Sequence, residues 1–87
     1  MDRYLIETPH TEQACRELGD LLNAAGYLNH FDWGCTVGVH CGWAIIPAEN
    51  DAQARLVVPS LVRDRARVVK IVKFTPSMMN SSHPQEL

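Results

Sequence analysis

The sequence lacks a strong net charge, a long apolar run and a cationic leader, and each absence excludes a class of protein. Its 87 residues carry a formal net charge of −2, which gives nucleic acid no basic surface to bind. No run of about 18 apolar residues occurs, so the sequence predicts no membrane-spanning helix. The opening MDRYLIETPH has neither a basic leader nor an apolar segment, and we therefore expect no signal peptide.

Cysteine pairing is also missing. The chain has three cysteines, an odd number, and none of them forms a CxxC motif. This argues against a disulfide framework and favours the reducing cytoplasm. A chain of this length forms one domain, and a domain so small gains stability from an oligomer interface.

What is present is an alternation of strand and helix signals. Apolar residues at spacings of three and four predict one helix, which begins after an N-cap at Thr11 and ends before Gly26. Asn50, with Gln53 three residues later, predicts the start of a second, short helix that stops near Pro59. Strands are predicted at 3–8, 32–37, 43–49 and 67–74, with a turn over 38–42. We expect the domain to cover residues 1–75 and a flexible tail to cover 76–87.

This order, β-α-β-β-α-β, predicts an α+β fold. Right-handed crossovers give a ferredoxin-like sandwich, in which a four-stranded antiparallel sheet of order 4-1-3-2 carries both helices on one face. The uncovered face is predicted to be apolar as well, because Leu5 lies on one side of its strand, Tyr4 and Ile6 lie on the other, and the last two strands repeat this pattern. We therefore expect a homodimer that buries this face against its copy.

Several segments resemble a known group of proteins: YLIE in the first strand, the Trp33–Cys35 segment, AENDAQAR at the second helix and ARVVKIVKF in the last strand. In pattern, residues 3–74 are similar to small dimeric α+β-barrel proteins, and most similar to bacterial proteins of the DUF4242 kind. That resemblance implies a ferredoxin-like fold. The group includes a nickel-binding member, but none of its ligands can be matched to this chain. The wider superfold hosts isomerases, cofactor-free monooxygenases and binding modules, so the fold alone does not identify a function.

The predicted topology gathers chemically useful residues at one end of the sheet. The first strand ends near His10 and Thr11, and the turn that contains His40 and Cys41 lies at the same end, with Cys35 as a further candidate. The segment containing Arg63, Asp64 and Arg65 is expected to return there before the last strand begins.

Three functions fit these residues. A transition metal, namely nickel, zinc or copper, could bind His10, Cys35, His40 and Cys41. Against this, Cys-x4-His-Cys is not a standard finger spacing, and neighbouring side chains diverge on an extended chain, so we assign no metal ligand. A small cofactor-free enzyme, an isomerase or monooxygenase, could use a cysteine whose pKa a histidine lowers.

The function we favour from sequence is a pocket for a small molecule or anion. Helix N-terminal amides with Arg63 or Arg65 would bind an anionic group, and tryptophans with Tyr4 would form an apolar wall. Cys15 is interpreted as a packing residue beside the helix stripe. No cofactor is assigned. The predicted ligand-binding residues are His10, Thr11, Trp33, His40, Cys41, Trp43, Arg63 and Arg65.

Overall fold

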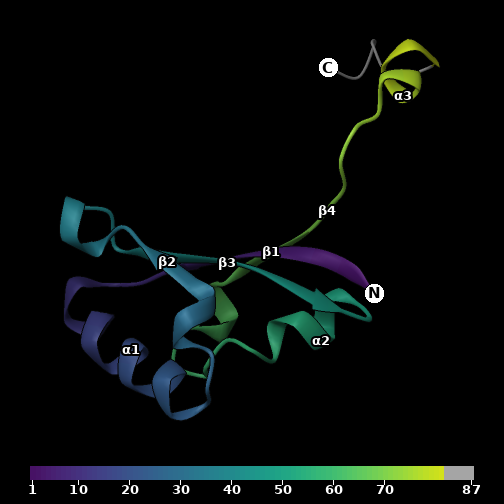
Figure 1. Ribbon diagram of the computed structural model, residues 1–87. Coiled ribbons are helices and arrows are strands. Elements are labelled where there is room, and N and C mark those ends of the chain that lie inside the picture. Colours follow the sequence, from purple (N-terminus) through teal and green to yellow (C-terminus); the bar gives the residue numbers. More distant parts are fainter. Residues whose placement is uncertain (82–87) are drawn as a thin grey trace.

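The computed structural model describes residues 1–81 of the 87-residue chain (Figure 1). The strands are β1 (Asp2–Pro9), β2 (Phe31–Trp33), β3 (Cys41–Ala48) and β4 (Arg67–Ile71). The helices are α1 (Cys15–Ala24), α2 (Asp51–Arg55) and α3 (Pro76–Ser81). Four 3₁₀ turns join them: η1 (Glu12–Ala14), η2 (Leu28–His30), η3 (Cys35–Val37) and η4 (Arg63–Arg65).

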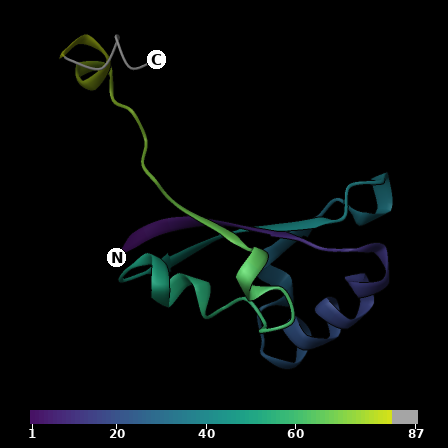
Figure 2. The same ribbon diagram turned by 180° about the vertical axis from the view of Figure 1, so that it is seen from behind.

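The strands form one antiparallel sheet in the order β2-β3-β1-β4. Read from the β4 edge, this order is 4-1-3-2. Helices α1 and α2 lie on the same face of the sheet (Figures 1 and 2). The predicted α+β architecture with a four-stranded open sheet is therefore confirmed. No helix in the described part of the chain has the length and apolar character needed to cross a membrane.

The core lies between the sheet and these two helices, because side chains alternate along each strand. On β1, Tyr4, Ile6 and Thr8 are buried beneath the sheet, whereas Leu5 and Glu7 project from the other face. The largest fully buried side chains of the core are Ile6, Thr8, Leu18, Leu22, Val58 and Val62. Each large apolar side chain in this set contributes about 1.5–3 kcal/mol relative to exposure.

The first helix begins later than the sequence predicts. Residues 12–14 form the 3₁₀ turn η1, and the α-helix starts at Cys15. Thr11 occupies the cap position before η1, but its side chain makes no capping hydrogen bond. The predicted C-terminal glycine is confirmed, since Gly26 has a φ of +83°. The late start places Cys15 at the N-terminus of α1, next to the end of β1.

The predicted cap of the second helix is confirmed. The backbone amide of Gln53 donates to Asn50 Oδ1 (2.8 Å), and Gln53 Oε1 accepts from the amide of Glu49 (2.9 Å). The helix ends at Arg55, before Pro59. The first bond satisfies an amide that the first turn of a helix leaves without a partner, and the second fixes the residue before the cap.

The hairpin differs from the prediction. A strand was expected over 32–37, with Trp33, Cys35 and Val37 alternating onto the core face, but β2 ends at Trp33. The carbonyl of Gly34 accepts hydrogen bonds from the amides of Val37 (3.0 Å) and Val39 (2.9 Å). These bonds curl the chain into η3 and leave Val37 exposed. Gly38 then supplies the left-handed residue, with a φ of +90°.

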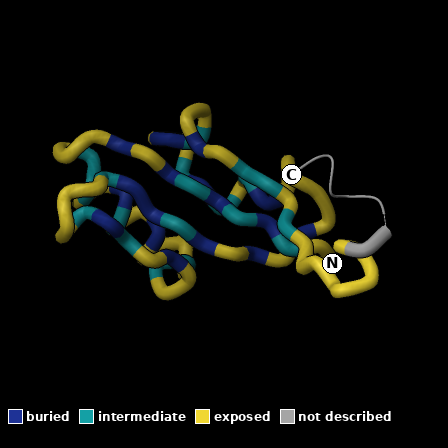
Figure 3. The backbone as a smooth tube through the Cα atoms, turned by 90° about the horizontal axis from the view of Figure 1, so that it is seen from above, coloured by how far each residue is buried: buried dark blue, intermediate teal, exposed yellow. Residues whose placement is uncertain are grey.

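The second face of the sheet carries an apolar row, as predicted, beside the ion pair of Glu7 and Arg67. Leu5 pairs with Ile45 on β3 and with Val69 on β4, so these three side chains form a cross-strand row. Ile45 is 52% exposed. Figure 3 views this side of the sheet, which neither α1 nor α2 covers. We call it the open face.

The last strand and the segment that follows it also differ in part from the prediction. Strand β4 ends at Ile71 rather than at residue 74. The first six residues of the tail predicted for 76–87 form α3, and residues 82–87 lie outside the described part. In Figures 1 and 2, α3 projects away from the body, on the side of the sheet opposite α1 and α2.

Candidate metal centre

Two histidines and two cysteines converge at one end of the sheet. One ligand atom from each of His10, Cys15, Cys35 and His40 lies within 4.8 Å of all the others. His10 Nε2 is 3.1 Å from Cys15 Sγ and 3.3 Å from Cys35 Sγ. Cys15 Sγ is 3.1 Å from Cys35 Sγ and 3.2 Å from His40 Nδ1. We call these four residues the Cys2His2 cluster.

The β1–β3 ladder brings the two histidines together. Its last pair is Pro9 with Cys41, and one residue further the amide of His10 donates to the carbonyl of His40 (3.0 Å). Both histidines therefore sit where the two strands leave the sheet.

A buried hydrogen bond fixes the ring of His10. Nδ1 lies 2.7 Å from the carbonyl oxygen of Thr8. Because a carbonyl only accepts, Nδ1 carries the proton, and Nε2 presents its lone pair to the two sulfurs. A carbonyl in this role is the usual partner of a metal-bound histidine. His10 is buried, so its orientation is set by the fold rather than by solvent.

The two sulfurs come from the first residues of short elements. Cys15 opens α1 and Cys35 opens η3, and both side chains are half-buried. The hydrogen bond to Cys35 raises the pKa of the Cys15 thiol to about 11, and desolvation acts in the same direction. Without a bound cation, Cys15 is therefore a protonated thiol at neutral pH.

The spacing of the four donor atoms suits a tetrahedral metal ion. Zinc binds sulfur at about 2.3 Å and nitrogen at about 2.0–2.1 Å, which places tetrahedral ligands about 3.3–3.8 Å apart. The four separations given above are 3.1–3.3 Å. The contact between the two sulfurs would have to open most, from 3.1 Å to about 3.8 Å, and both of these side chains are half-buried.

The structure brings together some of the predicted site residues. His10, His40 and Cys35 meet as the topology suggested, and Thr11 directly follows His10. The ring of Trp33 packs edge-on against His10, with 6.0 Å between ring centroids. Trp33 also covers Gly42, where an added Cβ would lie 2.8 Å from the indole.

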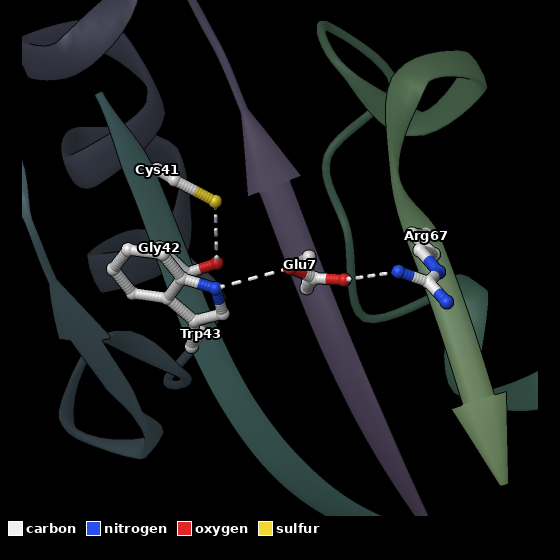
Figure 4. A network of polar contacts seen from close by, with 5 residues as sticks. All are labelled: Glu7, Cys41, Gly42, Trp43 and Arg67. Carbon is white, nitrogen blue, oxygen red and sulfur yellow. Dashed lines mark hydrogen bonds and ion pairs between the residues drawn. The ribbon is translucent and has the colours of Figure 1, made fainter. Parts of the chain in front are cut away.

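Cys41 does not join the cluster, and the alternative that made it a metal ligand is therefore wrong. Its side chain is buried, and its Sγ faces the carbonyl of Gly42 at 3.6 Å (Figure 4). Burial raises the pKa of this thiol. The physical reason is the one considered from sequence: His40 and Cys41 are neighbours on an extended chain, so their side chains diverge.

Trp43 lies on the opposite face of the sheet from Trp33. Its indole nitrogen donates to Glu7 Oε2 (3.3 Å), and Glu7 Oε1 pairs with Arg67 at 3.4 Å (Figure 4). Tyr4 is buried in the core. The two tryptophans and this tyrosine therefore do not form the single apolar wall that was predicted. A hollow of about 340 Å³ on the open face is lined by Leu5, His30, Asp32, Trp43, Ala44 and Ile45.

The predicted arginines do not contact the Cys2His2 cluster, although β4 begins at the expected end of the sheet, with Arg67 opposite Glu7. Arg63 and Arg65 belong to η4, and the Arg63 guanidinium donates to the carbonyl of Val58 (2.8 Å). Within residues 1–81, no hydrogen bond or ion pair joins either arginine to the Cys2His2 cluster. Their loop packs near α2, where Arg55 donates to the carbonyls of Arg63 (3.1 Å) and Ala66 (2.6 Å).

Cys15 is the member of the Cys2His2 cluster that the sequence interpretation missed. It was interpreted as a packing residue, and the structure shows that its sulfur also contacts three other members of the cluster. One signal was available. The spacing His10-x4-Cys15 is mirrored by Cys35-x4-His40, which gives each half of the site one imidazole and one thiol.

A hollow of about 350 Å³ lies beside the cluster. Its lining residues are Cys15, Arg16, Gly19, Leu28, Trp33 and Cys35. The wall is almost entirely apolar, and an added Cβ at Gly19 would meet no atom within 4 Å. The two sulfurs of the cluster are therefore reachable from this side.

Comparison of the chain with models of protein families, with curated proteins and with solved structures finds no match. The resemblance to DUF4242-like proteins stays a prediction, and the function must be inferred from the geometry of the site.

Proposed function

We propose that the protein binds one transition-metal ion through His10, Cys15, Cys35 and His40. The observation that carries this proposal is the convergence of these four donor atoms within 4.8 Å. Thiolate and imidazole are the ligands that zinc prefers, and nickel and copper also accept them. Among these three metals, zinc best suits a tetrahedral set of two sulfurs and two nitrogens.

The ligand count favours a structural, storage or sensing site. Catalytic zinc is usually held by three protein ligands and keeps a fourth position for water or substrate. Here the protein supplies all four donors, so the bound ion would be closed to water. This favours metal binding over the alternative of a small enzyme.

The test is a titration of the chelator-treated full chain with Co²⁺, followed by displacement with Zn²⁺. We expect one ion per chain and the visible bands of tetrahedral cobalt bound to thiolate. Cys15→Ser should abolish these bands, whereas Cys41→Ser is the matched control and should keep them. Binding that needs Cys41 but not Cys15, or no binding at all, would contradict the proposal.

A second candidate function is the binding of a small molecule, which the 350 Å³ hollow favours. Leu28, Trp33 and the aliphatic part of Arg16 would contact an apolar body. An anionic aromatic probe such as 1-anilinonaphthalene-8-sulfonate tests this. Gly19→Leu should fill the hollow and abolish binding, and equal binding to both proteins would place the probe elsewhere.

We also propose that the fold is ferredoxin-like and that two copies pair through the open face. The row Leu5, Ile45 and Val69 supports this, since such a face is costly to leave in water. Sedimentation should show a dimer, and Ile45→Glu should give a monomer. Leu56→Glu is the control, because Leu56 is 66% exposed and lies outside the sheet. A wild-type monomer at all concentrations would overturn the dimer. The cytoplasmic location stays a prediction from the cysteine count.

A further inference from the structure

The sulfurs of Cys15 and Cys35 are close enough to react with each other. They lie 3.1 Å apart, whereas a disulfide bond is about 2.05 Å long. Closing the gap therefore needs a movement of about 1 Å, shared between two half-buried side chains at the starts of α1 and η3. Both residues also line the 350 Å³ hollow, which gives a small oxidant access to them.

The third cysteine is separated from this pair by its environment. Cys41 is buried, and its sulfur lies against the backbone, 3.6 Å from the carbonyl of Gly42. It lines neither of the two hollows described above. Oxidation by a small reagent in solution should therefore select one pair of thiols out of the three.

We propose that Cys15 and Cys35 form a peroxide-sensitive thiol pair, and that their disulfide disables the metal site; the part concerning the metal rests on the proposed function. In the metal-free chain, one of the two thiols loses its proton and attacks the peroxide, the O–O bond breaks, and the hydroxide that leaves takes up that proton, so that sulfenic acid and water form. The second thiol then attacks that sulfur. The S–S bond forms, and the hydroxyl leaves as water with the thiol proton. Two electrons and two protons pass from the thiols to the peroxide.

The same reaction in the metal-bound protein would release the ion. Two thiolates, one peroxide and two protons give the disulfide, two waters and the free cation. His10 and His40 would then be the only remaining donors, and two imidazoles without thiolate bind a divalent ion far more weakly. A thiol reductant would restore both sulfurs and, with them, the site.

The first arm of the test uses the full-length Cys41→Ser protein without metal, with Cys41→Ala as a second version should the serine variant fold poorly. Treatment with hydrogen peroxide should remove both remaining thiols and lower the mass by two hydrogens without cross-linking chains. Dithiothreitol should restore the thiols. Persistence of both thiols, or a cross-link between chains, would overturn the proposal. Cys15→Ser should give no disulfide within the chain.

The second arm compares Co²⁺ binding by the reduced and oxidised forms of the same variant. We expect the tetrahedral bands only in the reduced form, and their return after reduction. Equal bands in both forms would overturn the link between the disulfide and the site. If neither form binds cobalt, the proposed function fails, while the thiol pair is judged on the first arm alone.

Discussion

The backbone amide of His10 donates to the carbonyl of His40 at 3.0 Å, and this bond continues the β1–β3 ladder beyond its last pair. The distance between the two imidazoles therefore depends on strand register. A slip of one residue would turn every side chain of a strand to the other face of the sheet. The same alternation that buries Ile6 and Thr8 thus aims His10 at the cluster.

Zinc should stabilise the folded chain, because its donors come from two stretches of the sequence, 10–15 and 35–40, that meet only after folding. With free zinc at about 100 times its Kd, the free energy of unfolding should rise by about 2.7 kcal/mol. Chemical denaturation with zinc and with a chelator measures this. The His10→Ala variant should give the same midpoint in both conditions, and an equal zinc effect in that variant would contradict the site.

Gly42→Ala should destabilise the end of the sheet that carries the site. The added Cβ would lie 2.8 Å from the Trp33 ring and 2.9 Å from Thr8 Oγ1, and such overpacking costs about 1–3 kcal/mol. Gly19→Ala is the control, since its Cβ meets nothing within 4 Å and alanine favours the helix by up to about 1 kcal/mol. Thermal unfolding of the two variants should shift in opposite directions.

Thr8→Val should weaken the fold without removing a metal ligand. The buried hydroxyl donates to the carbonyl of Gly42 and accepts from its amide, both at 3.1 Å. Leaving those backbone groups unpaired costs about 1–3 kcal/mol. The partner of His10 is the carbonyl of Thr8, which valine keeps. Urea unfolding should therefore show the loss while cobalt binding persists. Thr11→Val, at an exposed hydroxyl without a capping bond, should change stability by less than about 0.5 kcal/mol.

Asn50→Ala should lower the free energy of unfolding by about 1 kcal/mol, because it removes the acceptor for the amide of Gln53. Asn50→Asp keeps that acceptor and should behave like the natural chain. Urea denaturation compares the three proteins. A loss in the aspartate variant as large as that in the alanine variant would show that the cap is not the cause.

Much of the architecture follows from the sequence, because the spacing of apolar residues and the residues that cap helices are local signals. The alternation along β1 and the pair Asn50–Gln53 each have a physical cause within a few residues. Topology then correctly placed His10 and His40 at one end of the sheet, since an antiparallel hairpin returns to the end where its neighbour finished.

The side chains that complete the cluster were harder to predict, since they depend on turns of three residues. Cys15 becomes a donor because α1 starts there and not at residue 12. Cys35 reaches the cluster because the carbonyl of Gly34 accepts hydrogen bonds from two backbone amides, which ends β2 early. Neither the late start of α1 nor the early end of β2 changes the pattern of apolar residues in the sequence. The placement of Arg63 beside Val58 likewise depends on a hydrogen bond of the loop.

The two tryptophans lie on opposite faces of the sheet, so the fluorescence of each one should report a different event. Trp33 touches His10 edge-on, so its fluorescence should be quenched by a paramagnetic ion such as Cu²⁺ in the cluster and only shifted by closed-shell Zn²⁺. Trp43 is tied to Glu7 on the open face and should respond instead to self-association. Replacing either tryptophan with phenylalanine would leave one emitter for each event, so that metal uptake and pairing can be followed separately in the same chain without an added dye.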